Sequence, residues 1–567
     1  MRVLGLNGWP GRGHDAAACL VEDGHIVAVA EEERFARRKH AYGLAPHHAA
    51  AFCLSKAGLT LSDIDVVAFG WDIPRLHRDR GFGWPHSGAD ALEMLLPAAL
   101  FPRTHDPEFE FVAHHMAHAA SVYHLSRHQR AAVLVIDGQG EVESASLMHG
   151  RDGELTTLAT VPAAWSLGYF YDAVCQYSGL GADQAGKLMG LAAYGTVGDD
   201  TFGAFEFSGS GYSLPLIEAG LRSATEIDEN DVVLGRWLDH LAGRSPLPAN
   251  TARQVYDPRT GRFRWQTDRD PFDYKDMAAQ AQSALERAVG GLVDQLLALT
   301  GETVLHISGG CGFNATLNGK LLEHPGASEI FVQPVAGDAG VAIGAAVWIA
   351  ARAGERIQPM STSIAWGAEF ADGVVRELLD ESGLSYETYE DIAAEVAKRI
   401  GAQEVVGWFQ GPGEIGPRAL GHRSILADPK DPGMRDRINL RIKKREWWRP
   451  LAPSIRAENL TDHIDTSAAL PYMVVTRPLL PASREALPSI DHVDGTTRPQ
   501  SVHAHDEELY HRLLGHLADE TGVPVVLNTS FNGNSEPVVW TPEDALRTFT
   551  RLGLDSLAIG SFLVRKA

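Results

Sequence analysis

Ala132-Val-Leu-Val-Ile-Asp137-Gly138-Gln-Gly140 is the stretch that decides the fold, because an apolar run ends there in an aspartate and a glycine-rich turn. A second apolar run covers 144–148, and an Asp-Gly turn at 152–153 leads to a third run at 155–159. Short β-rich runs that reverse at Asp-Gly are typical of hairpins. The stretch therefore predicts three neighbouring strands, with a glycine loop after the first.

The N-terminus of the chain repeats this pattern. An apolar run at 2–7 leads to a glycine-rich loop and a second run at 15–21, and an Asp-Gly turn at 23–24 precedes a third run at 26–30. Two hairpins that each follow a glycine-rich loop are the layout of the actin-like, sugar-kinase-like ATPases, whose paired loops hold phosphates. We therefore predict an α/β fold with duplicated actin-like ATPase lobes.

Further glycine turns punctuate the same half of the chain. Val304-Leu-His-Ile-Ser-Gly-Gly-Cys-Gly-Phe-Asn314 has the pattern of a strand, a glycine turn and a helix start. Backbone N–H groups at such a turn can bind a nucleotide phosphate. A single glycine turn more often only reverses the chain. The ordered set, which includes the segment 187–195, favours a nucleotide site.

Two histidines four residues apart, His114 and His118, lie in an alanine-rich segment. Residues at this spacing share one face of a helix, so both imidazoles could bind one ion. Asp137 and Asp338 stand in glycine turns and offer two short carboxylates. Two His and two Asp suit iron(II), zinc or manganese better than magnesium or calcium. The alternative is a chance pair, since the chain carries 24 histidines.

Composition and charge exclude several classes of protein. The 567 residues allow two to four domains, with 44% hydrophobic and 22% charged residues, as in globular proteins. No apolar run reaches the roughly 18 residues of a membrane span, no signal peptide is visible, and the four cysteines form no CxxC pair. We expect a cytoplasmic protein without a membrane partner. A net charge of −23 disfavours nucleic-acid binding and suits a cationic small substrate.

A second α/β domain is expected from about residue 360, after an alanine-rich helix pattern. It holds a basic cluster at 434–449 within an otherwise acidic chain. Basic side chains at turns and helix starts favour convergence on an anion, and an amide and a hydroxyl after an apolar strand could add hydrogen bonds. The candidate anion-binding residues are Arg418, Lys443, Arg449, Arg498, Asn528 and Ser530. A solvated helix surface is the alternative for Arg435, Arg437 and Lys444.

Five strings together resemble the O-carbamoyltransferase family of nodulation and antibiotic biosynthesis, over essentially the whole chain. Each string alone is weakly specific, whereas the ordered set is far more specific. The strings are Gly13-His14-Asp15-Ala16-Ala17, Glu31-Glu-Glu-Arg-Phe35, His114-His-Met-Ala-His118, Gly413-Glu-Ile-Gly-Pro-Arg418-Ala-Leu-Gly and Leu527-Asn-Thr-Ser-Phe-Asn532.

The resemblance implies a Kae1-like pair of lobes over 1–355 and a YrdC-like domain over 360–567. The second domain would join carbamoyl phosphate to ATP, with Mg²⁺, to give carbamoyl adenylate and pyrophosphate. The first would then transfer the carbamoyl group to a hydroxyl of a small-molecule antibiotic and leave AMP. We expect an aminoglycoside acceptor such as tobramycin or kanamycin. Iron(II) is the ion implied at His114, His118, Asp137 and Asp338.

His14, on a glycine loop, is the candidate general base, since a histidine near its unperturbed pKa suits proton transfer at neutral pH. A structural histidine is the alternative. Acceptor contacts are expected at Arg12 and Asp228, although a charge run such as that around Asp228 is usually a solvated face. Adenylate contacts are implied at Lys39, Gly138, Gly168, Tyr194, Gly309, Gly310 and Asn314. A surface lysine is the alternative for Lys39.

Two other functions remain open at this point. A tRNA-modifying enzyme that uses threonylcarbamoyl adenylate would share both domain types, but the acidic charge argues against a tRNA partner. A non-catalytic, actin-like ATP-binding switch would explain the lobes but not a second nucleotide-handling domain. The sequence makes no prediction of the oligomeric state.

Overall fold

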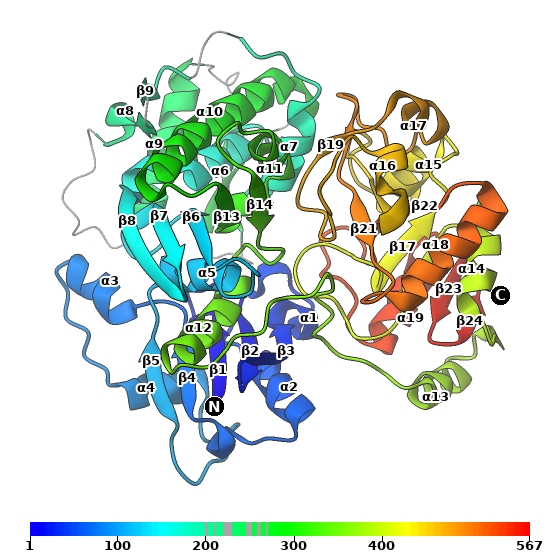
Figure 1. The fold of residues 1–567 in the computed structure, drawn as a ribbon, viewed down its shortest axis with the longest axis horizontal. Coiled ribbons are helices and arrows are strands. Elements are labelled where there is room, and N and C mark those ends of the chain that lie inside the picture. The colour runs from blue at the N-terminus through cyan, green and yellow to red at the C-terminus, as the bar shows by residue number, and fades with distance from the viewer. Residues whose placement is uncertain are drawn as a thin grey trace. The chain divides into compact units, whose positions relative to one another are not determined.

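The computed structural model describes residues 1–198, 202–208, 211–218, 229–244, 252–257, 262–267 and 270–566. The chain divides into two compact units (Figure 1). Unit 1 consists of Met1–Glu32 and His40–Pro359, and unit 2 consists of Glu33–Lys39 and the chain from Met360 onward. The sequence pattern does not predict that Glu33–Lys39 belongs to unit 2 and not to the N-terminal domain around it.

Unit 1 contains two five-stranded sheets with the same topology, which confirms the predicted duplication. In each sheet the first strand pairs antiparallel with the second and parallel with the fourth. The third strand pairs antiparallel with the second, and the fifth strand pairs parallel with the fourth. The first sheet is ordered β3 (His25–Glu31), β2 (Ala17–Glu22), β1 (Arg2–Asn7), β4 (Val66–Phe69) and β5 (Glu108–Phe111). The second is ordered β8 (Glu154–Pro162), β7 (Glu143–Arg151), β6 (Arg130–Ile136), β13 (Val304–Ser308) and β14 (Glu329–Val332).

Helices join and cover these sheets. The longest, α10 (Lys275–Thr300), is drawn in green at the top of Figure 1 and contacts α7 and β6. The other helices of unit 1 with eight or more residues are α2 (His47–Ala57), α4 (Gly88–Leu95), α5 (His114–Tyr123), α6 (Leu167–Tyr177), α7 (Ala185–Ala192), α9 (Glu229–Arg244), α11 (Ala315–Leu322) and α12 (Ala339–Arg352).

Helix α12 consists almost entirely of alanine, glycine and branched aliphatic residues. It lies beside α5 and β1, which are both distant from α12 in the sequence (Figure 1). The two helices approach so closely that a Cβ at Gly344 would lie 1.7 Å from the carbonyl oxygen of Ala117. Only glycine fits there without moving backbone. Ala117 stands between His114 and His118, so this contact fixes the helix that carries both histidines.

We expect Gly344→Ala to destabilise the protein by about 3 kcal/mol or more, at the upper end of overpacking costs, because backbone must move. Differential scanning calorimetry measures the effect. Gly290→Ala is the matched control, since an added Cβ in helix α10 meets nothing within 4 Å. That change should be neutral or stabilise by up to about 1 kcal/mol. Equal melting temperatures for the two variants would refute the close-packing argument.

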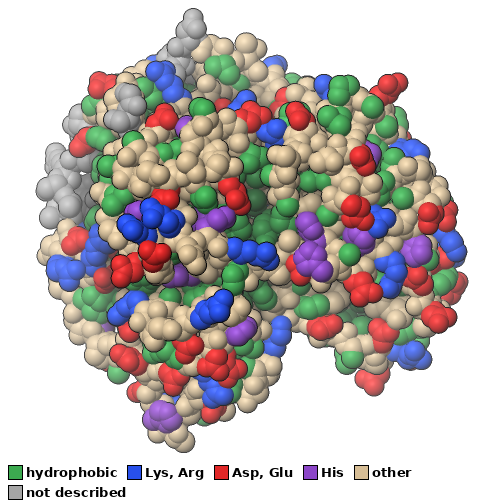
Figure 2. All heavy atoms as spheres, in the orientation of Figure 1, with side chains coloured by type: hydrophobic (Ala, Val, Ile, Leu, Met, Phe, Trp, Pro, Cys, Tyr) green, Lys and Arg blue, Asp and Glu red, His purple; other side chains and the backbone are tan. Residues whose placement is uncertain are grey.

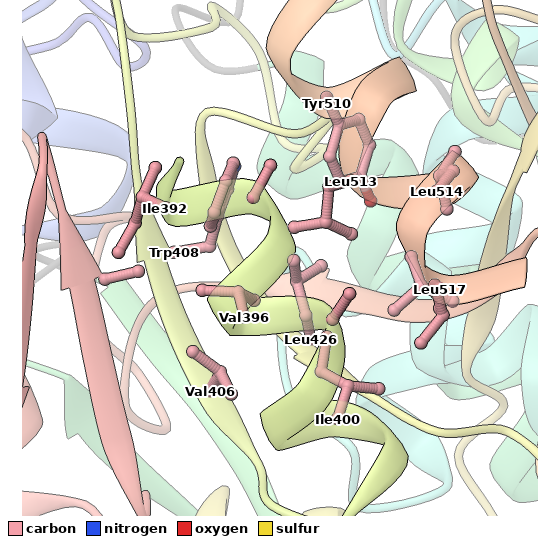
Figure 3. Close-up of a cluster of buried hydrophobic side chains, with 14 of the residues drawn as sticks. Ile392, Val396, Ile400, Val406, Trp408, Leu426, Tyr510, Leu513, Leu514 and Leu517 are labelled. Atoms are coloured by element: carbon pink, nitrogen blue, oxygen red, sulfur yellow. The ribbon is translucent and has the colours of Figure 1, made fainter. Parts of the chain in front are cut away.

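Unit 2 is built on one eight-stranded mixed sheet. Helices α14 (Ile392–Gly401) and α18 (Glu508–Thr521) pack on each other and on this sheet. Trp408 of the sheet and Tyr510 of α18 belong to the buried core that they form (Figure 3). The sheet is ordered β15 (Ser385–Thr388), β24 (Phe562–Arg565), β23 (Ser556–Ile559), β16 (Val406–Phe409), β17 (Arg423–Ala427), β22 (Val525–Ser530), β18 (Ala452–Arg456) and β21 (Gln500–Val502). Further helices are α13 (Asp372–Ser382) and α19 (Pro542–Arg551).

The surface of both units carries acidic and basic side chains that are interspersed on the face drawn in Figure 2. Among the described helices, none combines the length and the apolarity that a membrane crossing requires.

Candidate functional site

The four predicted metal ligands come together in unit 1. Helix α5 provides His114 and His118 one turn apart, Asp137 directly follows β6, and Asp338 stands at the N-terminus of α12. All four side chains are buried, and one donor atom of each lies within 4.8 Å of the others. In the described part of the chain this is the one cluster with the donor set and spacing of a metal site.

The distances between the donor atoms suit a single ion. Asp137 Oδ2 lies 3.1 Å from His114 Nε2 and 3.3 Å from His118 Nε2, and the two Nε2 atoms are 3.2 Å apart. Asp338 Oδ1 lies 3.7 and 3.8 Å from the same nitrogens. An ion with bonds of about 2.0–2.2 Å sets neighbouring ligands about 3–3.5 Å apart. The residues therefore fit a borderline divalent cation with nitrogen and oxygen ligands.

Neighbouring groups orient the ligands. The Nδ1–H of His114 donates to the carbonyl of Gly70 at 3.1 Å, which leaves Nε2 for an ion, and Trp71 lies against the same imidazole with ring centres 3.8 Å apart. The backbone N–H of Gly310 donates to Asp137 Oδ1 at 3.0 Å. Such hydrogen bonds fix the tautomer and direction of metal ligands.

The buried carboxylates give the cluster a negative potential. Burial disfavours the charged imidazole of His114, but Asp338 and Asp137 outweigh it and raise the pKa of His114 to about 9. Burial raises the pKa of Asp338, whereas hydrogen bonds from the two imidazoles hold the pKa of Asp137 well below its usual range. A divalent cation would neutralise this pair of carboxylates.

His14 lies at the edge of the cluster. Its Nε2 is 3.8 Å from Asp338 Oδ2, and its Nδ1 donates to Asp15 Oδ2 at 3.0 Å. The other oxygen of Asp15 accepts from His40 Nδ1 at 2.9 Å. The side chain of His14 is 49% exposed, so a substrate hydroxyl can reach it. Burial lowers the pKa of His14, but Asp338 and Asp15 outweigh it and raise the pKa to about 10, which differs from the unperturbed value expected of the base. A cation held by Asp338 would offset the first of these carboxylates, so His14 would act as a base at neutral pH only with the ion bound.

The predicted glycine turns gather beside the ligands. Gly168 packs on Gly138, where an added Cβ would lie 2.8 Å from the Cα of Gly138. Gly309, at φ +88°, packs on the end of β6, and Gly310 contacts Asp137. These glycines bring the backbone close to the cluster, where the N–H of Gly310 bonds Asp137.

Two other predicted adenylate residues have structural partners. The side chain of Asn314 caps α11 by accepting from Leu317 N–H at 2.9 Å, and it exchanges two hydrogen bonds with Gln282. Tyr194 follows α7 and packs edge-on against Phe272, with ring centres 5.5 Å apart. These contacts position the side chains whether or not they touch a ligand.

Unit 2 brings together the predicted arginines. Burial lowers the pKa of Arg418 to about 10, with a contribution from Arg449, and lowers the pKa of Arg498 well below its usual value, with contributions from Arg418, Arg445 and Arg449. These four guanidinium groups therefore lie near enough to repel one another. The Nε atom of Arg498 is buried without a hydrogen-bond partner in the described structure. Such mutually repelling cations are typical of a site for a multiply charged anion.

Lys443 is anchored in the same unit. Its Nζ donates to the carbonyl of Ser530, and to the carbonyl and Oδ1 of Asn532 at 2.9 and 2.7 Å. Burial lowers the pKa of Lys443, and Arg445 and Lys39 lower it further. Asn528 donates to Ser454 Oγ at 3.0 Å, and its Oδ1 is buried without a partner in the described structure.

The remaining predicted residues lie apart from these groups or outside the described chain. Lys39 belongs to unit 2, and not to the unit of the other predicted adenylate contacts. Arg12 is exposed on the loop of His14, and Asp228 lies outside the described residues. Arg437 donates to Asp555 at 2.6 Å and to the carbonyl of Gln403, so it belongs to the surface structure. Arg435 and Lys444 are partly or fully exposed.

Several supporting residues escaped the sequence analysis. Asp15 orients His14, and fully buried Glu141 accepts from the backbone N–H groups of His114 and Asp72 at 2.9 and 2.8 Å. Arg445 joins the arginine cluster. The Gly-His-Asp string contained a signal for Asp15, because a carboxylate beside a candidate base is a common way to orient it.

Comparison with known proteins identifies the family. The model described as "Carbamoyltransferase N-terminus" matches residues 2–76 and 93–347, and "Carbamoyltransferase C-terminus" matches 397–566. The chain is 37% identical to the nodulation protein NolNO of Sinorhizobium fredii over 98% of its own length and 79% of that protein. It is 34% identical to the 3'-hydroxymethylcephem-O-carbamoyltransferase of Amycolatopsis lactamdurans over 46% of its length and 49% of that enzyme.

The similarity to solved structures is weaker than the similarity to these relatives in sequence. A HypF structure from T. kodakarensis is 15% identical, covers 62% of this chain and 48% of its own, and has a TM-score of 0.32, which supports no functional conclusion. The sequence matches are sufficient by themselves, because they extend over both units. The chain belongs to the carbamoyltransferase family.

Proposed function

We propose that the protein is an ATP-dependent O-carbamoyltransferase that divides its work between the two units. Unit 2 activates the carbamoyl group as carbamoyl adenylate, and unit 1 transfers it to a hydroxyl of a small molecule. The observation that carries this proposal is the contrast in charge between the two sites. The mutually repelling arginines of unit 2 suit the phosphates of ATP and carbamoyl phosphate, whereas the His–Asp cluster of unit 1 suits a cation.

The activation step mainly requires a site in the protein that binds anions. Carbamoyl phosphate loses its phosphoryl group to water, which gives carbamate and inorganic phosphate. A carbamate oxygen then attacks the α-phosphorus of Mg²⁺-ATP, the bond to the bridging oxygen breaks, and pyrophosphate leaves. Arg418, Arg449 and Arg498 would hold the phosphoryl oxygens, whose charge grows in the transition state.

The transfer step needs a base beside an electrophile. The acceptor hydroxyl would lose its proton to His14 Nε2 as its oxygen attacks the carbamoyl carbon, and AMP would leave. Asp15 accepts the Nδ1–H of His14 and so keeps Nε2 available. A cation held by His114, His118, Asp137 and Asp338 would stabilise negative charge on the carbamoyl oxygen or the adenylate phosphate. Iron(II) is the ion we propose for this donor set.

The acceptor we propose is an aminoglycoside antibiotic. The net charge of −23 favours a polycationic substrate and disfavours tRNA. The test is to incubate the protein with ATP, Mg²⁺, carbamoyl phosphate and tobramycin, kanamycin or a hydroxymethylcephem, and to search by mass spectrometry for addition of one carbamoyl group. We expect the product with an aminoglycoside. No product with any of these acceptors, from protein that exchanges pyrophosphate into ATP, would overturn the acceptor class.

A further inference from the structure

The segment Glu33–Lys39 is the one part of the first 359 residues that packs in unit 2. Its contacts there are extensive. Phe35 lies edge-on to Trp540, with ring centres 5.5 Å apart, and two arginines of the segment donate hydrogen bonds to backbone carbonyls of the C-terminal sequence. A segment that only linked two units would have no need of these interactions.

Arg34 is bonded to the loop that carries Arg418. Its side chain is 2% exposed, and Nη2 donates to the carbonyl of Gly416 at 2.6 Å. Gly416 lies two residues before Arg418. Backbone bonds from Gly413 to Ala368 and from Ile415 to Ile364 fix the start of the same loop, and Asn528 bonds the carbonyl of Ala419 after Arg418 at 3.1 Å. Arg34 therefore supplies the side-chain support on the N-terminal side of Arg418.

Arg37 is bonded to a second loop of the anion site. Its Nη1 and Nη2 donate to the carbonyls of Val538 and Pro537 at 2.7 and 3.0 Å, and Nη1 lies 3.4 Å from Asp544. The same loop is bonded to Asn532, whose Nδ2 donates to the carbonyl of Glu536 at 2.6 Å. Asn532 in turn accepts from Lys443.

We propose that Arg34 and Arg37 are positioning residues of the activation reaction, through which the N-terminal sequence shapes the anion site of unit 2. Arg34 holds the loop of Arg418, and Arg37 holds the loop that anchors Lys443. Both guanidinium groups bond backbone carbonyl oxygens of these loops, so the role of the two arginines is to orient the phosphate-binding groups. This inference rests on the proposed function for its chemistry, but the loss of anion binding can be measured without it.

The test compares Arg34→Gln and Arg37→Gln with the wild-type full chain. Isothermal titration with inorganic pyrophosphate measures anion binding, and carbamoyl-phosphate-dependent exchange of labelled pyrophosphate into ATP measures activation. We expect a weaker pyrophosphate Kd and a raised KM for carbamoyl phosphate, each by about 10- to 100-fold, the effect of losing one charge-assisted hydrogen bond. Melting curves establish that each variant is folded.

Arg437→Gln is the matched control, because Arg437 bonds a backbone carbonyl and a carboxylate of unit 2, as Arg37 bonds two carbonyls and lies beside a carboxylate. Its 32% exposure resembles the 23% of Arg37. It should lose similar stability and keep the wild-type Kd. If Arg34→Gln fails to fold, Arg37→Ala decides the question, since guanidinium at low concentration should restore its pyrophosphate binding while sodium at equal ionic strength should not.

The outcomes separate this inference from the proposed function. Wild-type Kd and KM values in both folded variants, or failure of the rescue, would overturn the positioning role. If the variants lose pyrophosphate binding but the wild type exchanges no pyrophosphate, the positioning role stands and the proposed activation reaction fails.

Discussion

Replacing Arg498 by Met is expected to abolish carbamoyl-phosphate-dependent pyrophosphate exchange while it raises the melting temperature of the ligand-free protein. Arg418, Arg445 and Arg449 repel the charge of Arg498, whose Nε has no hydrogen-bond partner in the described structure. A guanidinium in this position is costly until an anion arrives, because burial and like charges both oppose it. Binding sites commonly trade stability for function in this way.

We expect the exchange rate of Arg498→Met to fall at least 100-fold, since hydrogen bonds to a developing phosphoryl charge are among the largest contributions to catalysis. The melting temperature should rise by about 2–4 °C per kcal/mol of relieved repulsion. Arg437→Met is the control, because it removes the ion pair with Asp555 and should lower the melting temperature while exchange continues. A lower melting temperature for Arg498→Met would contradict the repulsion.

Replacing His14 by Asn is expected to abolish carbamoyl transfer and to spare pyrophosphate exchange. His14 is the exposed imidazole nearest to the ligand cluster, and Asp15 directs its Nε2 toward Asp338. General base catalysis contributes about 10²- to 10⁴-fold, so the transfer rate should fall within that range. Product formation is followed by mass spectrometry in the same samples that are assayed for exchange.

His25→Asn is the control for this variant, since His25 is an exposed histidine of unit 1 whose Nδ1 donates to the carbonyl of Asp23. It should leave both reactions unchanged. Transfer by His14→Asn within about threefold of the wild-type rate would exclude His14 as the base.

The metal ligands were predictable from sequence because each signal is local. A four-residue spacing puts His114 and His118 on one helix face, and glycine turns mark Asp137 after an apolar strand and Asp338 before an alanine-rich helix. The repeated hairpins likewise gave the duplicated topology of unit 1, since strand order follows from short connections.

Residue type alone did not separate the arginines of the basic cluster. Arg437 and Arg445 lie eight residues apart in one run, yet Arg437 pairs with Asp555 while Arg445 faces Arg449. The difference depends on a carboxylate more than a hundred residues away. The same limit applies to Arg34, whose acceptor Gly416 is 382 residues distant, and to Asn314, whose partner Gln282 lies on another helix. Contacts at such separations leave no periodic trace in the chain.

The central claim is that activation belongs to unit 2 and that the cation-binding cluster of unit 1 serves transfer alone. The most direct test measures the metal content and the pyrophosphate exchange of Asp137→Asn together. We predict that bound metal falls from about one ion per chain to almost none, and that transfer is lost, while exchange stays within about twofold of the wild type. Exchange that disappears in step with the metal would contradict the account.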